Sequence, residues 1–248
     1  MKNPTEKLIL GLKADKSDVE IHQHSAFQIV FTEDYPFQTS INNTVHQNIF
    51  GFVIKPQVAH SCVCSQSILS IINVEPFSFL GKIIASKLKE NESLIFENKK
   101  NFQTFFEINQ DSCFLQAIIN IGETEIDKSA FDERIIKAIL YVQQNFQSDK
   151  FSIQDLANYI FLSPSRLSSL FKQQIGSSIS KYLLWTRLRN ATFLILAKRN
   201  KSITEIALES GFYDSSQMNK YMYQMFGITP SKLRIKSDLI QFLETEPS

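Results

Sequence analysis

Two pairs of short capped helices, about fifty residues apart, are the feature that most constrains how this chain can fold. In the first pair, Ser152 precedes an apolar stripe that ends at Ile160, and Ser163-Pro164 opens another helix three residues later. Serine is a favoured N-cap residue, and proline suits the first position of a helix. Two short helices joined by about three residues have the spacing of a helix-turn-helix unit.

The same arrangement recurs downstream. Ser202 precedes the apolar positions Ile203 and Ile206, and Gly211 supplies the left-handed residue at which helices commonly end. Asp214 is then a new N-cap, and Gln217 follows three residues later, as in a capping box. The sequence therefore predicts a second helix-turn-helix unit.

A continuous helix is expected between the two units, because residues 179–197 keep one apolar face. About 20 residues at 1.5 Å per residue span roughly 30 Å, close to the ~34 Å of one turn of B-DNA. A stiff spacer of this length would place two recognition helices in successive major-groove segments on one face of the duplex.

Charge is distributed unevenly along the chain. The formal net charge is +1, but residues 128–236 hold 16 Lys and Arg against 7 Asp and Glu, whereas residues 1–127 hold 10 against 15. A basic block in an otherwise acidic chain indicates a polyanionic partner, most commonly nucleic acid. A helical domain with a lysine-rich solvated face is the alternative.

The first half of the chain alternates short apolar runs with turn-forming residues, which predicts strands. The clearest runs are Phe27–Phe31, Ile49–Ile54 and Ile68–Val74. Helices are expected at Phe77–Leu88 and Ser112–Ile121, with a loop over 89–101. We divide the chain into a first domain at 1–127, a second domain at 128–236 and an acidic tail at 237–248, with the linker in the charged stretch 122–133.

Nothing in the sequence indicates a membrane protein or an exported one. No apolar run approaches ~18 residues, and the N-terminus lacks the apolar segment of a signal peptide. Cys62, Cys64 and Cys113 cannot form a closed disulfide framework, which favours a reducing compartment. We therefore expect a soluble cytoplasmic protein.

The two units and their connecting helix carry further characteristic positions. They comprise FSIQDLANYIFLSPSRLSSLFKQQIG (151–176), ITEIALESGFYDSSQMNKYMYQMFGITPSKLR (203–234), and Tyr182, Arg187 and Ala191 between them. On these stretches, residues 132–234 resemble the AraC/XylS family of bacterial transcription regulators. The resemblance implies a two-pronged DNA-binding domain attached to a sensor or dimerisation domain.

The chain departs from the pattern of that family at two places. Phe161 occupies a turn position where the family often has glycine. On the second recognition helix, Tyr223 and Gln224 stand where basic residues are common, which leaves Lys220 as the only cation on that helix. These departures imply that the first unit carries more of the affinity for DNA.

The apolar stripes decide which side chains face away from the core and toward DNA. Arginine reads guanine through two hydrogen bonds, and serine hydroxyls reach base edges or phosphates. The predicted DNA-facing residues of the recognition helices are Ser165, Arg166, Ser168, Ser169, Lys172, Gln173, Ser215, Ser216, Gln217, Asn219 and Lys220. Predicted phosphate contacts around the connecting helix are Arg187, Arg189, Lys198, Arg199 and Lys201. Gln217 has an alternative role as a capping partner only.

Three of the four histidines lie in a pattern of their own. His22-x-His24 and Gly51-x4-Pro56-x3-His60 resemble a cupin-type β-barrel sensor domain. That resemblance implies a metal-ligating glutamate four residues after His24, where this chain has Gln28. His22, His24 and His60 could still form a three-histidine metal site; the alternative is that they line a barrel pocket.

Other residues of the first half also have two interpretations. His60, Cys62 and Cys64 share one face of an expected strand, which suits metal or redox sensing, although buried thiols are also ordinary core residues. Aromatic residues either line an apolar ligand cavity or pack in the core. That aromatic set is Phe27, Phe31, Phe50 and Phe52.

Together these patterns predict an α+β protein of two domains: an N-terminal cupin-like β-barrel with flanking helices, and a C-terminal all-α domain of two helix-turn-helix units joined by a long helix. The expected function is that of a sequence-specific transcription regulator, an activator by the commoner habit of the family it resembles, bound to double-stranded DNA. RNA polymerase, a small-molecule effector and a second copy of the chain are further expected partners.

The alternative is a cupin-type metal-binding protein or enzyme with an appended helical domain. Gln28 and the lack of a second acid–base pair beside the histidines argue against catalysis. We therefore expect neither enzymatic activity nor a cofactor.

Overall fold

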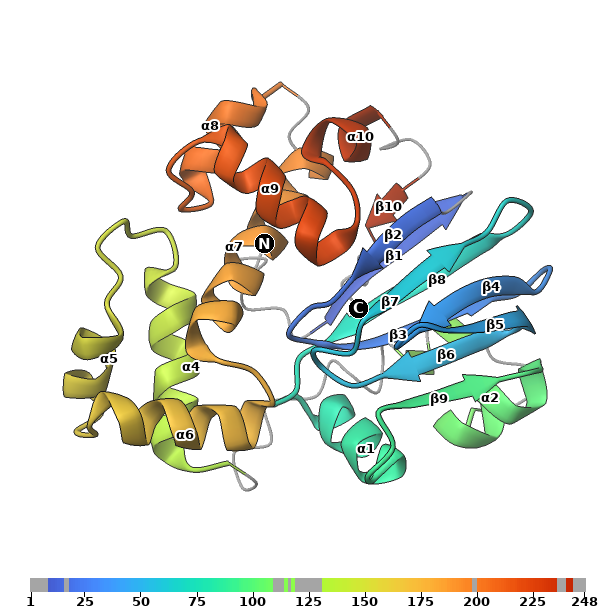
Figure 1. Ribbon diagram of the computed structural model, residues 1–248, viewed down its shortest axis with the longest axis horizontal. Helices are drawn as coiled ribbons and strands as arrows, with labels where there is room; N and C mark the ends of the chain where they lie inside the picture. Colours follow the sequence, from blue (N-terminus) through green and yellow to red (C-terminus); the bar gives the residue numbers. More distant parts are fainter. Residues whose placement is uncertain are drawn as a thin grey trace.

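The structure is a computed structural model that describes residues 9–15, 18–108, 114–115, 117–118, 131–197, 200–235 and 240–242 of the 248-residue chain. A sheet-rich part from the first half of the chain lies beside a group of helices from the second half (Figure 1). The expected α+β class with two domains is confirmed.

The described strands form two antiparallel sheets. The larger sheet has the order β10-β1-β8-β3-β6-β9, and the smaller one has the order β2-β7-β4-β5. The strands are β1 (Ile9–Asp15), β2 (Asp18–His22), β3 (Phe27–Thr32), β4 (Phe37–Ile41), β5 (Thr44–Ile49), β6 (Gly51–Ile54), β7 (His60–Val63), β8 (Ile68–Val74), β9 (Ser93–Phe96) and β10 (Ile240–Phe242). No strand pairing joins the two sheets within the described residues, so the expected barrel is an open pair of sheets.

The larger sheet is buried on both faces. One face packs against the smaller sheet, where Val30 and Phe52 share an apolar cluster with Ile41. The other face, including Ile29 and Phe31, packs under helices α1 (Phe79–Leu88) and α2 (Lys99–Phe106). Since the central strands contact apolar groups on both sides, β3 and β6 are buried at every residue. They therefore appear in the sequence as continuous apolar runs.

The aromatic set predicted for a cavity or the core packs in the core. Phe27, Phe31 and Phe50 lie in the cluster under α1 and α2, and Phe52 lies between the two sheets. The strands expected from apolar runs correspond to β3, β6 and β8, and the expected first helix begins at Phe79 after the N-cap Ser78.

The loop expected over 89–101 is wrong, because this segment contains β9 and the first turn of α2. The strand β9 pairs with β6 at the edge of the larger sheet, but its apolar run is only three residues long, Leu94–Phe96, within a polar stretch, which is too short to indicate a strand. Most of the helix expected at 112–121, the linker expected within 122–133, and Cys113 lie outside the described residues. Residues 240–242 of the predicted tail pair with β1 as β10.

Helices make up the rest of the described chain. They are α4 (Glu133–Asn145), α5 (Ile153–Tyr159), α6 (Pro164–Ile175), α7 (Ile179–Ala197), α8 (Ile203–Glu209), α9 (Ser215–Phe226) and α10 (Pro230–Ile235). Each predicted N-cap accepts a hydrogen bond from a backbone N–H of its own first turn; these caps are Ser152, Ser163, Ser202 and Asp214. None of the helices that the structure describes is long and apolar enough to cross a membrane.

A buried ion pair joins the two domains. Glu75 follows the last residue of β8, while Trp185 and Arg189 lie on α7. The Glu75 carboxylate accepts a hydrogen bond of 2.8 Å from the indole N–H of Trp185 and forms an ion pair with Arg189. Burial raises the pKa of Glu75, and Arg189 opposes that shift. Each of these two charges is buried between the domains, away from water, and is therefore stabilised by the other.

Candidate functional site

The first recognition helix, α6, presents a polar face that its own packing leaves free. Ser163 caps its N-terminus, and Gly176 ends it in the left-handed conformation with φ of +79°. Leu167, Leu170 and Phe171 are buried against the domain core. The opposite face is exposed at each residue predicted to face DNA, namely Ser165, Arg166, Ser168, Ser169, Lys172 and Gln173.

The turn before α6 has the geometry that the family pattern assigns to glycine. Phe161 adopts a φ of +57°, a left-handed conformation that costs a side-chain-bearing residue energy, and its ring is 94% exposed. Gly211 occupies the equivalent turn of the second unit with φ of +81°. The backbone conformation is therefore retained although the residue differs.

The second recognition helix, α9, uses part of its polar set to hold its own N-terminus. Asp214 accepts the backbone N–H of Gln217 at 2.7 Å, and the Gln217 side-chain oxygen accepts the backbone N–H of Tyr213 at 3.0 Å. The capping role of Gln217 is thus realised in the structure. Met218, Met222 and Met225 are buried beneath the helix. Of the predicted DNA-facing set, Ser216, Asn219 and Lys220 are exposed, and Ser215 and Gln217 are half-buried.

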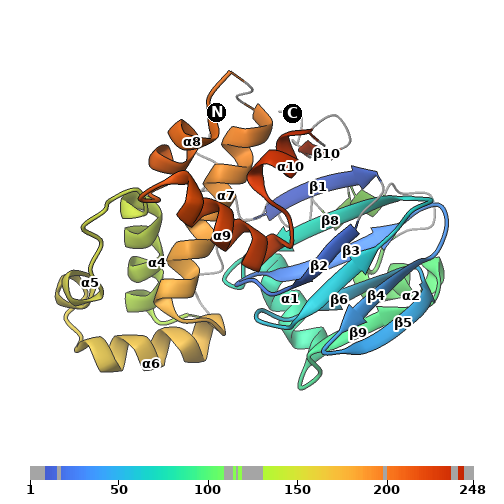
Figure 2. The same ribbon diagram turned by 45° about the horizontal axis from the view of Figure 1, so that its top comes forward.

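The two units sit at opposite ends of α7 (Figure 2). This helix has 19 residues, which at 1.5 Å per residue is about 28 Å. The length of α7 is thus close to one helical turn of B-DNA, ~34 Å.

Arg189 cannot make the phosphate contact expected of it, since it is 3% exposed and paired with Glu75. Arg187 is half-buried, and its guanidinium donates to the backbone oxygens of Phe146 at 2.7 Å and Ser148 at 2.9 Å. Lys201 pairs with Glu209, and Lys198 and Arg199 lie outside the described residues. The arginines of the connecting helix thus bind groups of the protein itself. No pattern in the sequence indicated these partners.

Arg187 also helps to join the two units. The loop that it holds, 146–148, packs on the turn at Gly211, where an added Cβ would lie 2.5 Å from the Phe146 oxygen. Gln147 of the same loop donates to the Glu209 oxygen at 2.7 Å. Arg187 therefore connects α7, the first unit and the second unit.

We expect Arg187→Ala to lower the free energy of unfolding by about 1–2 kcal/mol, because two carbonyl groups lose their donor. The slope of log affinity against log salt is expected to stay unchanged, since Arg187 serves protein carbonyls. Urea unfolding and salt titration of DNA binding measure the two effects, with the exposed Lys150→Ala as control. If stability is unchanged and the salt slope becomes shallower by about one unit, Arg187 contacts a DNA phosphate instead.

The end of α9 rests on strand β2 of the other domain. Gly227, which ends the helix with φ of +64°, approaches so closely that an added Cβ would lie 2.6 Å from Val19 Cγ1 and 2.8 Å from the Glu20 oxygen. The Tyr223 hydroxyl donates to the Glu20 carboxylate. The second recognition helix is thus attached to the sheet domain.

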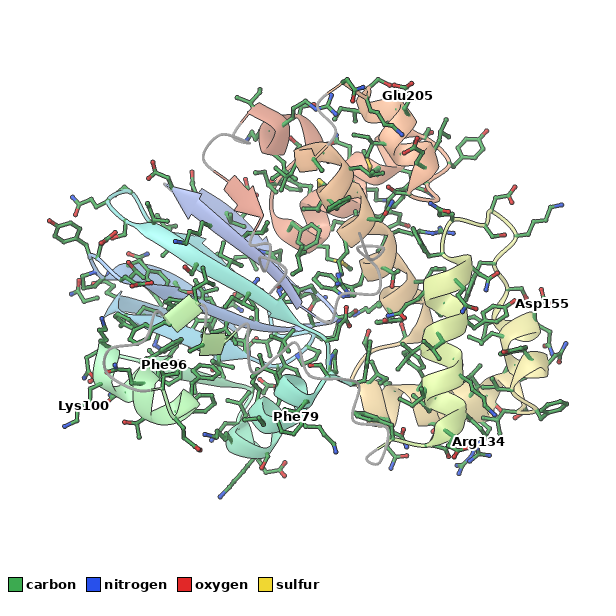
Figure 3. The ribbon with its side chains drawn as sticks, turned by 180° about the vertical axis from the view of Figure 1, so that it is seen from behind. Phe79, Phe96, Lys100, Arg134, Asp155 and Glu205 are labelled. Carbon is green, nitrogen blue, oxygen red and sulfur yellow. The ribbon has the colours of Figure 1, made fainter. Side chains whose placement is uncertain are left out.

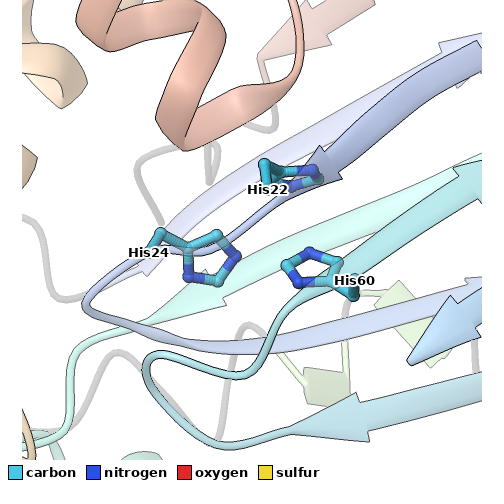
Figure 4. Close-up of side chains that lie close together, drawn as sticks. All are labelled: His22, His24 and His60. Carbon is cyan, nitrogen blue, oxygen red and sulfur yellow. The ribbon is translucent and has the colours of Figure 1, made fainter. Parts of the chain in front are cut away.

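His22, His24 and His60 come together beside this contact. His22 and His60 are directly opposite each other in the β2–β7 pair, and His24 follows β2 in the next turn. Figure 4 shows the three rings around a common space. One ring nitrogen from each lies within 4.8 Å of the other two, and all three residues are buried. The structure therefore brings together the three residues predicted as metal ligands.

Backbone carbonyls orient all three rings. The Nδ1 atoms of His22, His24 and His60 lie 2.7, 3.1 and 3.0 Å from the backbone oxygens of Glu20, Ala26 and Val58. Carbonyl oxygens only accept, so each Nδ1 carries the proton and, in the neutral ring, each Nε2 carries the lone pair. Burial lowers the pKa of His22 to about 4 and of His24 to about 3, and it lowers the pKa of His60 well below its usual value.

The other candidate ligands of this region have different partners. Gln28 donates to Asn73 Oδ1 at 3.1 Å, so the position of the cupin glutamate belongs to a buried amide pair. Cys62 shares the buried face of β7 with His60, as expected, whereas Cys64 is buried just after the end of the strand, and its thiol donates to the backbone oxygen of Ser67. Burial raises the pKa of the Cys62 thiol, which keeps it protonated.

An apolar cavity of about 100 Å³ lies between the domains next to the histidines. Sheet residues such as Leu10, Val30 and Ile71 line one side, and Phe226 and Leu233 of the helical domain line the other. His22, His60 and Cys62 contribute to its wall. Sequence did not reveal this cavity, because its walls come from both domains.

Comparison with known proteins is consistent with this architecture. Residues 156–236 match a family described as "Helix-turn-helix domain". The arabinose operon regulatory protein of Escherichia coli is 31% identical over 42% of this chain and 35% of its own length. The regulatory protein PocR of Salmonella typhimurium is 27% identical over 90% of this chain and 74% of its own length. The chain spans about half or less of the length of the first curated relatives that it matches.

Among solved structures, apo ToxT from Vibrio cholerae shares the fold over 93% of this chain and 98% of its own, with a TM-score of 0.62 and 12% sequence identity. The likeness covers both domains and shows that a sheet domain of two open sheets followed by this helical domain is a known arrangement. The match shows that residues 156–236 form a helix-turn-helix domain, and the names of the relatives and the two capped units on one connecting helix agree with the resemblance of this region to the AraC/XylS family of transcriptional regulators.

Proposed function

We propose that this protein is a sequence-specific DNA-binding transcription regulator that places α6 and α9 in successive major-groove segments. The observation that carries the proposal is the exposed polar face of α6, where Arg166, Lys172 and four serine or glutamine side chains have no role in the core. Major-groove recognition by a helix needs this combination of base-reading and phosphate-contacting groups. The basic charge of residues 128–236 supports the same assignment.

The two helices are expected to contribute unequally. The α6 face offers Arg166 and Lys172, whereas α9 offers Lys220 and commits Gln217 to its own N-terminus. The first unit then supplies more of the affinity, and the second unit adds contacts whose strength depends on how α9 sits against β2. The proposal includes activation, in line with relatives such as the transcriptional activator RhrA of Rhizobium meliloti, and RNA polymerase as a partner.

Two roles are proposed for the sheet domain. It senses a small molecule, and it also mediates dimerisation. The interdomain cavity supports the sensing role, because a ligand there would touch both domains at once. A solved structure of ToxT holds an unsaturated fatty acid, which supports an apolar ligand as the class to test. His22 and His60 add polar groups to a wall that is otherwise mostly apolar.

Selection of bound duplexes from a random pool by the full-length protein, at near-physiological salt, tests the function. The expected result is a motif with two half-elements about one helical turn apart. A parallel selection in the presence of a cell extract detects dependence on an effector. Failure to enrich any sequence in both selections would contradict the proposal, whereas enrichment only with extract would support the sensing role.

A further inference from the structure

We propose that His22, His24 and His60 bind one divalent transition metal ion through their Nε2 atoms, and that this ion fixes the contact between β2 and the second recognition helix. The metal site stands on the geometry of the sheet domain alone. Its effect on α9 rests in addition on the proposed DNA-binding function.

Two of the proposed ligand atoms have no other use in the structure. The Nε2 atoms of His24 and His60 are buried and have no hydrogen-bond partner among the described residues. A buried polar atom without a partner costs about 1–3 kcal/mol, and gathering such atoms in one place repeats that cost. A metal ion is the partner that satisfies several imidazole lone pairs simultaneously.

The spacing of the three ring nitrogens fits an ion after a small contraction. Atoms that all lie within 4.8 Å of one another share a central point that is at most about 2.8 Å from each, against about 2.0–2.1 Å for a Zn–N bond. Rotation of the rings supplies the difference. The backbone carbonyls at Nδ1 hold the tautomer in which Nε2 is free, as is common for metal-binding histidines.

The chemistry of the ligand set selects the class of metal. Three neutral imidazoles suit zinc, nickel, copper, cobalt or ferrous iron and disfavour magnesium and calcium, which prefer oxygen ligands. With three protein ligands a position stays open for water or a small ligand. Because His22 and His60 also line the interdomain cavity, that ligand would arrive from the cavity.

Glu20 connects the site to the recognition helix. Its backbone oxygen accepts the Nδ1–H of His22 and lies against Gly227, and its carboxylate accepts the Tyr223 hydroxyl. A shift of His22 toward an ion therefore moves the residue on which α9 rests. A second route runs from His24, whose ring centroid is 5.5 Å from that of Trp185, to the ion pair of Glu75 and Arg189 on α7.

Trp185 is the only tryptophan of the chain and reports on the site directly. Titration of the full-length apo protein with Co(II) is expected to quench its fluorescence with an end point at one equivalent, and Zn(II) is expected to displace Co(II) and restore it. His60→Gln and His24→Gln are expected to weaken binding by more than about 100-fold, since loss of a mere hydrogen-bond partner to a metal-binding histidine costs about 10- to 100-fold. His46→Gln, at the remaining histidine, is the matched control and is expected to bind normally.

Thermal unfolding of the wild-type protein keeps the test independent of how well the variants fold. Zn(II) is expected to raise the Tm by several degrees and Mg(II) to leave it unchanged, because only a ligand of the folded state stabilises it. Absence of a Zn(II) effect on both Tm and Co(II) quenching, or equal binding by His46→Gln and His60→Gln, would overturn the site.

The coupling has its own readout. Zn(II) is expected to slow hydrogen exchange of backbone amides in α9 near Gly227 in the wild-type protein but not in His22→Gln, and to change affinity for the selected duplex by at least several-fold. Metal binding without a change at α9 would overturn the coupling and keep the site. Altered exchange in a protein that selects no DNA sequence would contradict the proposed function and leave the site standing.

Discussion

Replacing Glu75 by alanine is expected to lower the free energy of unfolding by about 3–5 kcal/mol, because it removes one partner of a buried ion pair. The Arg189 guanidinium would lose its carboxylate, and the Trp185 indole N–H would lose its acceptor, in an interface that excludes water. Burial of a charge without compensation is among the few single changes with an effect of this size. Urea unfolding monitored by Trp185 fluorescence measures the loss.

A double variant separates the missing charge from the missing contacts. Glu75→Leu combined with Arg189→Met is expected to recover most of the stability, since an apolar pair of similar volume often replaces a buried ion pair without loss. Glu90→Ala, at an exposed glutamate of the same domain, controls for loss of a carboxylate and is expected to stay within about 0.5 kcal/mol of the wild type. A cost below 1 kcal/mol for Glu75→Ala would mean that the ion pair does not hold the domains together.

Arg166→Ala is expected to weaken binding to the selected duplex by roughly 10- to 100-fold. One arginine that binds a guanine through two hydrogen bonds contributes about 1–3 kcal/mol to the discrimination between bases. Binding to an unrelated duplex is expected to fall much less. Arg166 lies in the first turn of α6, exposed and next to the cap Ser163, which is where a recognition helix meets base edges. Competition titrations with both duplexes at one salt concentration measure the difference.

Two lysines provide the comparison. Lys172→Ala on the last turn of α6 is expected to weaken both duplexes alike and to make the salt slope shallower by about one unit, as for a phosphate contact. Lys100→Ala removes the same charge from α2 on the opposite side of the molecule (Figure 3) and is expected to leave both affinities unchanged. Equal losses on both duplexes for Arg166→Ala would remove its role in reading bases.

The helical domain was predictable because its elements are set by interactions close in sequence. Ser152, Ser163, Ser202 and Asp214 cap helices within three residues of themselves, and the apolar stripe behind each cap needs no distant partner to be recognised. The exposed face of α6 followed from the same stripe. The strands β3, β6 and β8 were equally visible, since burial on both faces gives continuous apolar runs.

The edge strand β9 was missed because its apolar run is short. Its apolar residues, Leu94–Phe96, stand within a polar stretch and number fewer than the roughly four or more that indicate a buried strand, so only the pairing with β6 defines it. The expected barrel depended on whether the edges of the two sheets would meet, which is a property of the assembled sheets.

The sequence by itself determined the residue types available to the protein: three histidines in one region, arginines along the connecting helix, and two capped recognition helices. Tertiary structure alone decided what the arginines do, because Arg189 meets Glu75, 114 positions away, and Arg187 meets carbonyls about 40 positions away. It also decided that the histidine rings converge, through the register that sets His22 opposite His60. Interactions between residues close in sequence determine the helices and their caps. A buried charge or lone pair must find a partner away from water, and that partner depends on which distant segments the fold packs beside it.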